Sequence, residues 1–153
     1  MSEQEFVRPG ILLASHGQLC VRIMDSARMI GLSLDNVVAK PLLEGVSPAT
    51  YEKELREVLD SFPDGSIVLI DLFGGTPFNT LAKILPEYPG IYAAAGLNLP
   101  MLLEVCGACN FMTGRELIDT ALRAGSEGVV DINGFVENLL NSSRPQADDD
   151  EDI

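Results

Sequence analysis

Two short apolar runs of the sequence each end in a side chain that is able to do chemistry. The run ILLAS ends before His16, the only histidine of the chain, and the run IVLI ends before Asp71. A carboxylate that accepts the Nδ1 proton of an imidazole fixes the tautomer and leaves Nε2 as a nucleophile, a base or a metal ligand. A lone histidine at the end of a strand is also common as a structural polar residue, so the pair has to be judged with its surroundings.

A glycine pair and a threonine follow Asp71 in the stretch DLFGGTPFN. Gly74 and Gly75 allow a close backbone approach or a positive φ, and Thr76 offers a hydroxyl next to the N–H groups of a helix start. Such a surface suits an anion such as phosphate. The stretch lacks the Gly-Lys-Ser/Thr ending of a Walker loop, so bound ATP is not predicted.

The elements that position these residues alternate between short β-branched runs and segments of helical period, which is typical of parallel βαβ units. The predicted strands are 10–15, 36–40, 66–71, 91–95 and 128–132, with helices over 19–30, 48–62, 78–85, 101–109 and from Thr113 to Gly125. Apolar residues at successive strand positions predict a sheet covered on both faces. Ligands of such doubly wound sheets bind beyond the carboxyl ends of the strands, where the winding reverses. If the first and third strands are neighbours, His16 and Asp71 meet at that point.

Composition excludes several classes of protein. The 153 residues fit one domain, and the net charge of −13, with five acidic residues over 148–152, disfavours nucleic acid and anionic membrane surfaces. An odd number of cysteines, no signal peptide and no apolar run long enough to cross a bilayer predict a cytoplasmic protein. The pair Cys106 and Cys109 has CxxC spacing but no second ligand pair, which favours two packed thiols over a zinc or redox site.

Three stretches, SHG, DLFGGTPFN and AGLNLPMLLE, occur in an order that resembles the mannose-family enzyme IIA domain of the bacterial phosphoenolpyruvate-dependent sugar phosphotransferase system. The resemblance spans about residues 10–132. It implies an enzyme, a phosphotransferase in which His16 takes a phosphoryl group from the phosphocarrier HPr and passes it to the IIB component of a sugar permease. Asp71 would orient His16.

The resemblance also implies how the phosphoryl group is held and how the chain folds. Thr76, Gly17 and Gly75 would bind the phosphoryl group, with no metal and no cofactor. The implied fold is a three-layer αβα sandwich with four parallel strands and an antiparallel edge strand, residues 128–132, that helps to form a homodimer. We expect one domain over 1–143, with an extra helix at about 134–142 and a disordered acidic tail over 144–153.

Two other functions remain open from the sequence. A phosphotransfer subunit of a dihydroxyacetone kinase also uses a histidine after its first strand, although DLFGGTPFN and NLPMLLE favour the sugar system. Alternatively, the protein is a regulator whose phosphorylation state is read by a partner. The sequence does not name the sugar, because its selection would belong mainly to the membrane permease.

Overall fold

The computed structural model describes residues 5–143, which build a four-stranded parallel sheet. The strands are β1 (Ile11–His16), β2 (Val37–Leu42), β3 (Ile67–Ile70) and β4 (Tyr92–Ala95). They lie in the order β2-β1-β3-β4, and every neighbouring pair is parallel. The predicted parallel sheet is therefore confirmed, and each of these four strands falls within two residues of its expected bounds.

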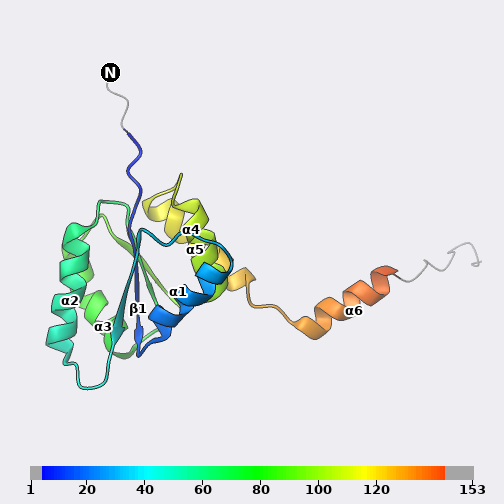
Figure 1. Ribbon diagram of the computed structural model, residues 1–153, viewed down its shortest axis with the longest axis horizontal. Coiled ribbons are helices and arrows are strands. Elements are labelled where there is room, and N and C mark those ends of the chain that lie inside the picture. Colours follow the sequence, from blue (N-terminus) through cyan, green and yellow to red (C-terminus); the bar gives the residue numbers. More distant parts are fainter. Residues whose placement is uncertain (1–4, 144–153) are drawn as a thin grey trace, which may run out of the picture.

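Helices cover both faces of the sheet (Figure 1). One face carries α1 (Leu19–Met29), α4 (Leu99–Ala108) and α5 (Gly114–Glu127), and the other carries α2 (Pro48–Ser61), α3 (Gly75–Ile84) and the short 3-10 helix η1 (Leu85–Glu87). Alternate side chains of a strand point to opposite faces. Ile11 and Leu13 accordingly pack under α1, α4 and α5, whereas Leu12 and Ala14 pack under α2 and α3. This two-sided core explains why the β1 run is apolar at successive positions.

The direction of winding reverses between β1 and β3. The chain goes from β1 outward to β2, returns through α2 to β3 on the other side of β1, and then continues outward to β4. The carboxyl ends of β1 and β3 therefore flank the topological switch point, which is the usual binding position in sheets of this kind. The predicted doubly wound αβα class is confirmed by this topology.

The starts of the helices follow the sequence signals in two cases and depart from them in a third. Ser47 caps α2 by accepting the Thr50 N–H at 3.1 Å, and Asn98 caps α4 by accepting the Met101 N–H at 2.9 Å. The third helix was expected over 78–85, but α3 begins earlier, at Gly75. Its N-cap is Gly74, whose φ of 79° and ψ of 179° suit only glycine.

The helix α5 does not end at Gly125, as the sequence predicted, but runs on to Glu127. Gly125 is buried inside the helix, where a Cβ atom would lie 2.7 Å from Cε of Met101. This glycine therefore permits close packing of α5 on α4 instead of ending the helix.

The expected antiparallel edge strand over 128–132 is not formed in the described chain. Residues 128–131 have no strand assignment, and α6 (Ile132–Ser143) begins where the strand was to end. Because a strand exists only by pairing with a neighbour, a segment that leaves the body without reaching β4 cannot become one. Figure 1 shows α6 standing away from the sheet and its covering helices.

The C-terminal helix α6 carries an apolar stripe that packs against nothing in the described residues. Its exposed large apolar side chains are Ile132, Phe135, Val136, Leu139 and Leu140. The predicted acidic tail over 144–153 lies outside the described residues. Among the helices within 5–143, none combines the length and the apolar character needed to cross a bilayer.

Candidate functional site

His16 and Asp71 lie together at the switch point. Oδ2 of Asp71 is 3.0 Å from Nδ1 of His16 and also accepts the backbone N–H of His16 at 3.0 Å. The backbone N–H of Asp71 in turn donates to the carbonyl of Ala14 at 3.1 Å. The pairing of β1 with β3 therefore fixes the carboxylate relative to the ring. An ionised carboxylate only accepts hydrogen bonds, so in the neutral imidazole this contact selects the tautomer with the proton on Nδ1 and the lone pair on Nε2.

The two side chains differ in their contact with solvent. The Asp71 side chain is 10% exposed and the His16 side chain 46% exposed. The second carboxylate oxygen of Asp71, Oδ1, is buried and accepts no hydrogen bond from the described residues. The negative charge of Asp71 is therefore compensated mainly by the two donors of His16, which favours the proton on Nδ1. The rest of the imidazole remains accessible to a reagent.

A tight turn holds His16 at the end of β1. Gly17 has a φ of 58°, and its N–H donates to the carbonyl of Leu42 at 2.8 Å. Ser15 is completely buried, donates to the Gly17 carbonyl at 3.0 Å and accepts the Cys20 N–H at 2.9 Å. Ser15 thus ties the turn to the first turn of α1. The sequence reasoning missed this role, although the absence of a good N-cap residue at Gln18 was a usable signal.

Gly75 lies against the edge of the imidazole that carries Nε2. A Cβ atom on Gly75 would stand 2.8 Å from Cε1 and 2.9 Å from Nε2 of His16, and the φ of Gly75 is 81°. Both the space and the backbone conformation therefore require glycine. Gly75 is also the first residue of α3, and its N-cap Gly74 has no side chain to bind the free N–H groups. The positive end of the helix is thus open to an anion next to Nε2.

His16 lines a pocket of about 550 Å³ at the carboxyl ends of the strands. Thr76 lines a different groove, whereas the residues that line this pocket are His16, Gly17, Leu42, Leu43 and Glu44. Its leucines and glutamate were not predicted, although Leu42 pairs with His16 in the sheet register and marks a third strand end at the same edge. The structure thus brings His16, Gly17, Asp71 and Gly75 together, with Thr76 beside them at the start of α3.

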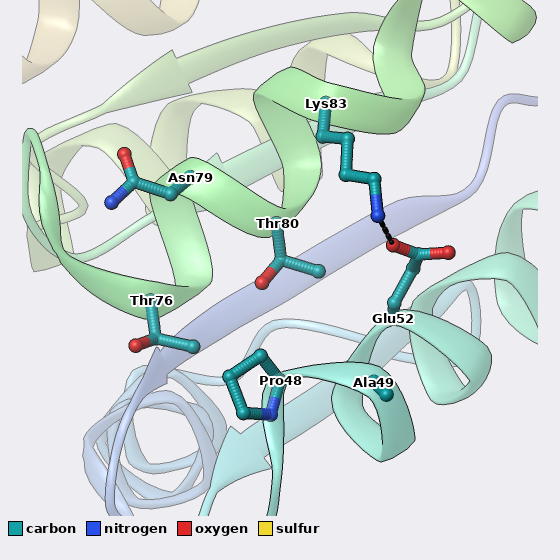
Figure 2. A pocket seen from close by; sticks show the side chains of 7 residues that line it. All are labelled: Pro48, Ala49, Glu52, Thr76, Asn79, Thr80 and Lys83. Carbon is teal, nitrogen blue, oxygen red and sulfur yellow. Dashed lines mark hydrogen bonds and ion pairs between the residues drawn. The ribbon is translucent and has the colours of Figure 1, made fainter.

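Thr76 faces a groove of about 560 Å³ between α2 and α3 (Figure 2), which is lined by Pro48, Ala49, Glu52, Thr76, Asn79, Thr80 and Lys83. Nζ of Lys83 is 2.9 Å from Oε1 of Glu52, and Arg56 binds the same carboxylate at 3.1 Å. Hydrogen bonds from Lys83 and then Arg56 lower the pKa of Glu52. The lysine of this groove is therefore already paired.

The two cysteines with CxxC spacing lie away from the site. Cys106 and Cys109 are both buried and unbridged, and the Cys109 thiol donates to the Cys106 carbonyl at 3.2 Å. Burial raises the pKa of the Cys106 thiol to about 11. Within residues 5–143, no group of three His, Cys, Asp or Glu side chains is arranged as a metal site would require. The packing accords with two thiols in a core.

The sequence model of the EIIA-man family, described as "PTS system fructose IIA component", matches residues 10–122. This chain belongs to that family. Its relatives include the fructose-specific EIIA component of Bacillus subtilis (strain 168), which is 25% identical over 142 residues, 92% of this chain and 97% of that protein.

A second relative is the mannose-specific EIIAB component of Escherichia coli (strain K12), which is 30% identical over 124 residues. The match spans 78% of this chain but only 38% of that longer protein. Among solved structures, the phosphotransferase system component EIIA from Streptococcus agalactiae superposes with a TM-score of 0.76 at 30% identity, covering 82% of this chain and 98% of the other. The resemblance seen in the sequence is confirmed, and the family consists of components of the sugar phosphotransferase system.

Proposed function

We propose that His16 is the residue that carries the phosphoryl group in this family member, receiving it from phosphorylated HPr and passing it to a IIB component of a mannose-family permease. The observation that carries the proposal is the pairing of Nδ1 with Asp71 while Nε2 lies beside Gly75 at the open end of α3. Nδ1 is thus held by the Asp71 carboxylate, and Nε2 is free to react at the open end of α3.

The proposed reaction is an in-line displacement. The lone pair of Nε2 on His16 attacks the phosphorus, the new Nε2–P bond forms as the bond from phosphorus to the carrier histidine breaks, and the carrier imidazole leaves with the electron pair. The proton on Nδ1 of His16 stays in its hydrogen bond to Asp71. That carboxylate favours the phosphorylated ring, because its negative charge lies next to the N–H that the ring must keep. Transfer to IIB is the same step in reverse with a different acceptor.

The phosphoryl oxygens would be held by backbone N–H groups near Gly17 and Gly75, with the Thr76 hydroxyl as a third donor. The dipole of α3 adds a favourable field for the negative charge. The N–H groups at the start of α3 support this part of the proposal, because Gly74 caps the helix without a side chain; the N–H of Gly17 itself already donates to the carbonyl of Leu42, so a donor near Gly17 would come from a residue that follows it. Preorganised donors of this kind stabilise the transition state as well as the product.

We also propose that the protein works as a homodimer in which residues 128–131 of one copy reach the open edge of β4 on another. Supporting features are the outer edge of β4, which pairs with no strand among residues 5–143, and the exposed Val129 and Val130. Sedimentation of the full chain would check this: a dimer is expected, and a monomer at all concentrations would contradict it. The kinase-subunit and regulator alternatives gain no support from the relatives described above.

The test of the proposed function uses phosphoenolpyruvate, enzyme I and HPr with the full chain. We expect one acid-labile, base-stable phosphate per wild-type chain and none on His16→Ala. The phosphate on the wild-type chain should then move to an added IIB component. Because His16 is the only histidine, its assignment needs no mapping. Label that survives His16→Ala, or no label on the folded wild type, would contradict the proposal.

A further inference from the structure

The groove between α2 and α3 is a hollow that the proposed reaction does not use, except at its border with Thr76 (Figure 2). Its volume of about 560 Å³ suits a small molecule. The two helices face each other here with short side chains, Pro48 and Ala49 from α2 and Thr76 and Thr80 from α3. Because none of these side chains is long, they do not fill the space between the helices. The groove is therefore open to an occupant.

Thr80 brings a hydroxyl into this groove for which the described chain supplies no partner. The residue is only 6% exposed, and Figure 2 shows its oxygen turned into the space between the two helices. Within residues 5–143 this hydroxyl makes no hydrogen bond, whereas the hydroxyl of Thr120, a residue that is 8% exposed, donates to the carbonyl of Glu116 at 3.0 Å. A buried hydroxyl without a partner destabilises a folded protein, so its presence in a groove points to a ligand.

The charged side chains along the groove compensate one another. Nζ of Lys83 lies 2.9 Å from Oε1 of Glu52, and Arg56 binds Glu52 at 3.1 Å and Glu87 at 2.7 Å. Among the described residues that line the groove, an ionic ligand therefore finds no unpaired charge. Lys83 and Glu52 nevertheless keep hydrogen-bonding capacity, because an ammonium group has several N–H donors and a carboxylate has several lone pairs. The groove thus suits a neutral ligand that both donates and accepts hydrogen bonds.

We propose that this groove binds a neutral molecule with several hydroxyl groups, of the size of a hexose or a hexitol. Each hydroxyl of such a molecule can both donate and accept a hydrogen bond, which matches the Thr80 hydroxyl, the Lys83 ammonium group and the Glu52 carboxylate together. The C–H groups of the ligand would lie on Pro48 and Ala49, the apolar side of the groove. Binding at this site needs no phosphoryl group, so the inference stands apart from the proposed function.

The test follows the backbone amide NMR signals of the full chain during separate additions of D-glucose, D-fructose and mannitol. At least one of these compounds should shift the signals of Ala49, Thr80 and their neighbours along a saturable curve. We expect a dissociation constant on the order of 1 mM, because a small ligand gains only a few hydrogen bonds here. Betaine, a small zwitterion without hydroxyl groups, should leave the same signals unchanged.

Thr80→Val removes the hydroxyl but keeps the shape of the side chain, and Thr120→Val is the matched control in α5. Loss of one hydrogen bond to the ligand should raise the dissociation constant about tenfold in Thr80→Val. The melting temperature of the free Thr80→Val protein should equal or exceed that of the wild type, because this hydroxyl has no partner to lose. Thr120→Val should bind as the wild type does but melt at a lower temperature, because it loses its hydrogen bond to Glu116.

Several results would overturn the proposal. Saturable binding of none of the three compounds does so, and so do equal shifts caused by betaine, because the groove would then not select hydroxyl groups. Wild-type affinity in Thr80→Val, or a fall in its melting temperature like that of Thr120→Val, would show that the Thr80 hydroxyl serves the fold and not a ligand. Failure of the proposed function is a separate result, since a chain that takes no phosphoryl group on His16 can still bind these compounds.

Discussion

Replacement of Gly75 by alanine is a direct test of the contact between α3 and the reactive ring. The new Cβ would lie 2.8 Å from Cε1 and 2.9 Å from Nε2 of His16, whereas carbon atoms in contact prefer about 3.5 to 4.0 Å. The ring must therefore move by roughly 0.6 Å or more, which breaks its 3.0 Å hydrogen bond to Asp71 or displaces Nε2 from the line of attack. A displacement of about 1 Å at a reacting centre costs on the order of 10²-fold in rate. We expect phosphorylation of His16 to fall by about that factor.

Gly74→Ala is the matched control. Gly74 has nearly the same φ, 79° against 81°, but a Cβ at this position would meet no atom within 4 Å. Each substitution imposes backbone strain on the order of 1–3 kcal/mol, or several degrees in the melting temperature of a domain of this size. Thermal unfolding should therefore be lowered in both variants, while transfer to His16 collapses only in Gly75→Ala. Wild-type transfer in Gly75→Ala, or an equal loss in Gly74→Ala, would refute the reasoning.

Three further predictions concern the residues behind the ring and the core. In Asp71→Asn the amide can donate to Nδ1 and select the other tautomer, so transfer should slow by roughly 10²- to 10⁴-fold, and nitrogen NMR of the single histidine should report the change of tautomer. Ser15→Ala leaves the Gly17 carbonyl and the Cys20 N–H without their partner and should lower the free energy of unfolding by about 1–3 kcal/mol in denaturant titrations, whereas Ser15→Thr keeps the hydroxyl and should lose less. Because the Cys106 thiol ionises near its ordinary pKa of 9.0 when unfolded but at about 11 when folded, stability should fall as the pH rises between these values. Cys106→Ala should show a shallower fall, and identical pH slopes would contradict the assignment.

The pairing of His16 with Asp71 could be predicted from the sequence only on the condition that the first and third strands are neighbours. Polar residues at the ends of neighbouring parallel strands must lie close together, and the alternation of elements predicted a parallel sheet, but the order of its strands came from the structure. The position of Gly75 did not follow in the same way. Thr76-Pro77 is a standard helix start with Thr76 as the N-cap, but the positive φ of Gly74 and Gly75 places the N-cap two residues earlier, at Gly74. A positive φ gives no signal in the sequence other than the glycine that adopts it.

The prediction for the C-terminal segment failed in the other direction, because a predicted element did not form. Residues 128–132 have the β-branched composition of a strand, yet composition cannot supply the neighbouring strand that a ladder needs. Ser15 was passed over for a related reason, since its two hydrogen bonds join a turn to a helix and have no periodic signature. Periodicity therefore predicted the layers, while single contacts within turns had to come from the structure.

The placement of the site on the two interior strands has a consequence for how it meets other molecules. β1 has β2 and β3 on its two sides, and β3 has β1 and β4, so both strands that lead to His16 and Asp71 are hydrogen-bonded along both edges. Opening of such interior strands costs close to the free energy of global unfolding, unlike the fraying of loops or edge strands. An incoming molecule therefore spends none of its binding free energy on ordering these two strands. Each binding partner meets the same rigid arrangement of these two strands, so any conformational change needed for a fit must occur in the partner.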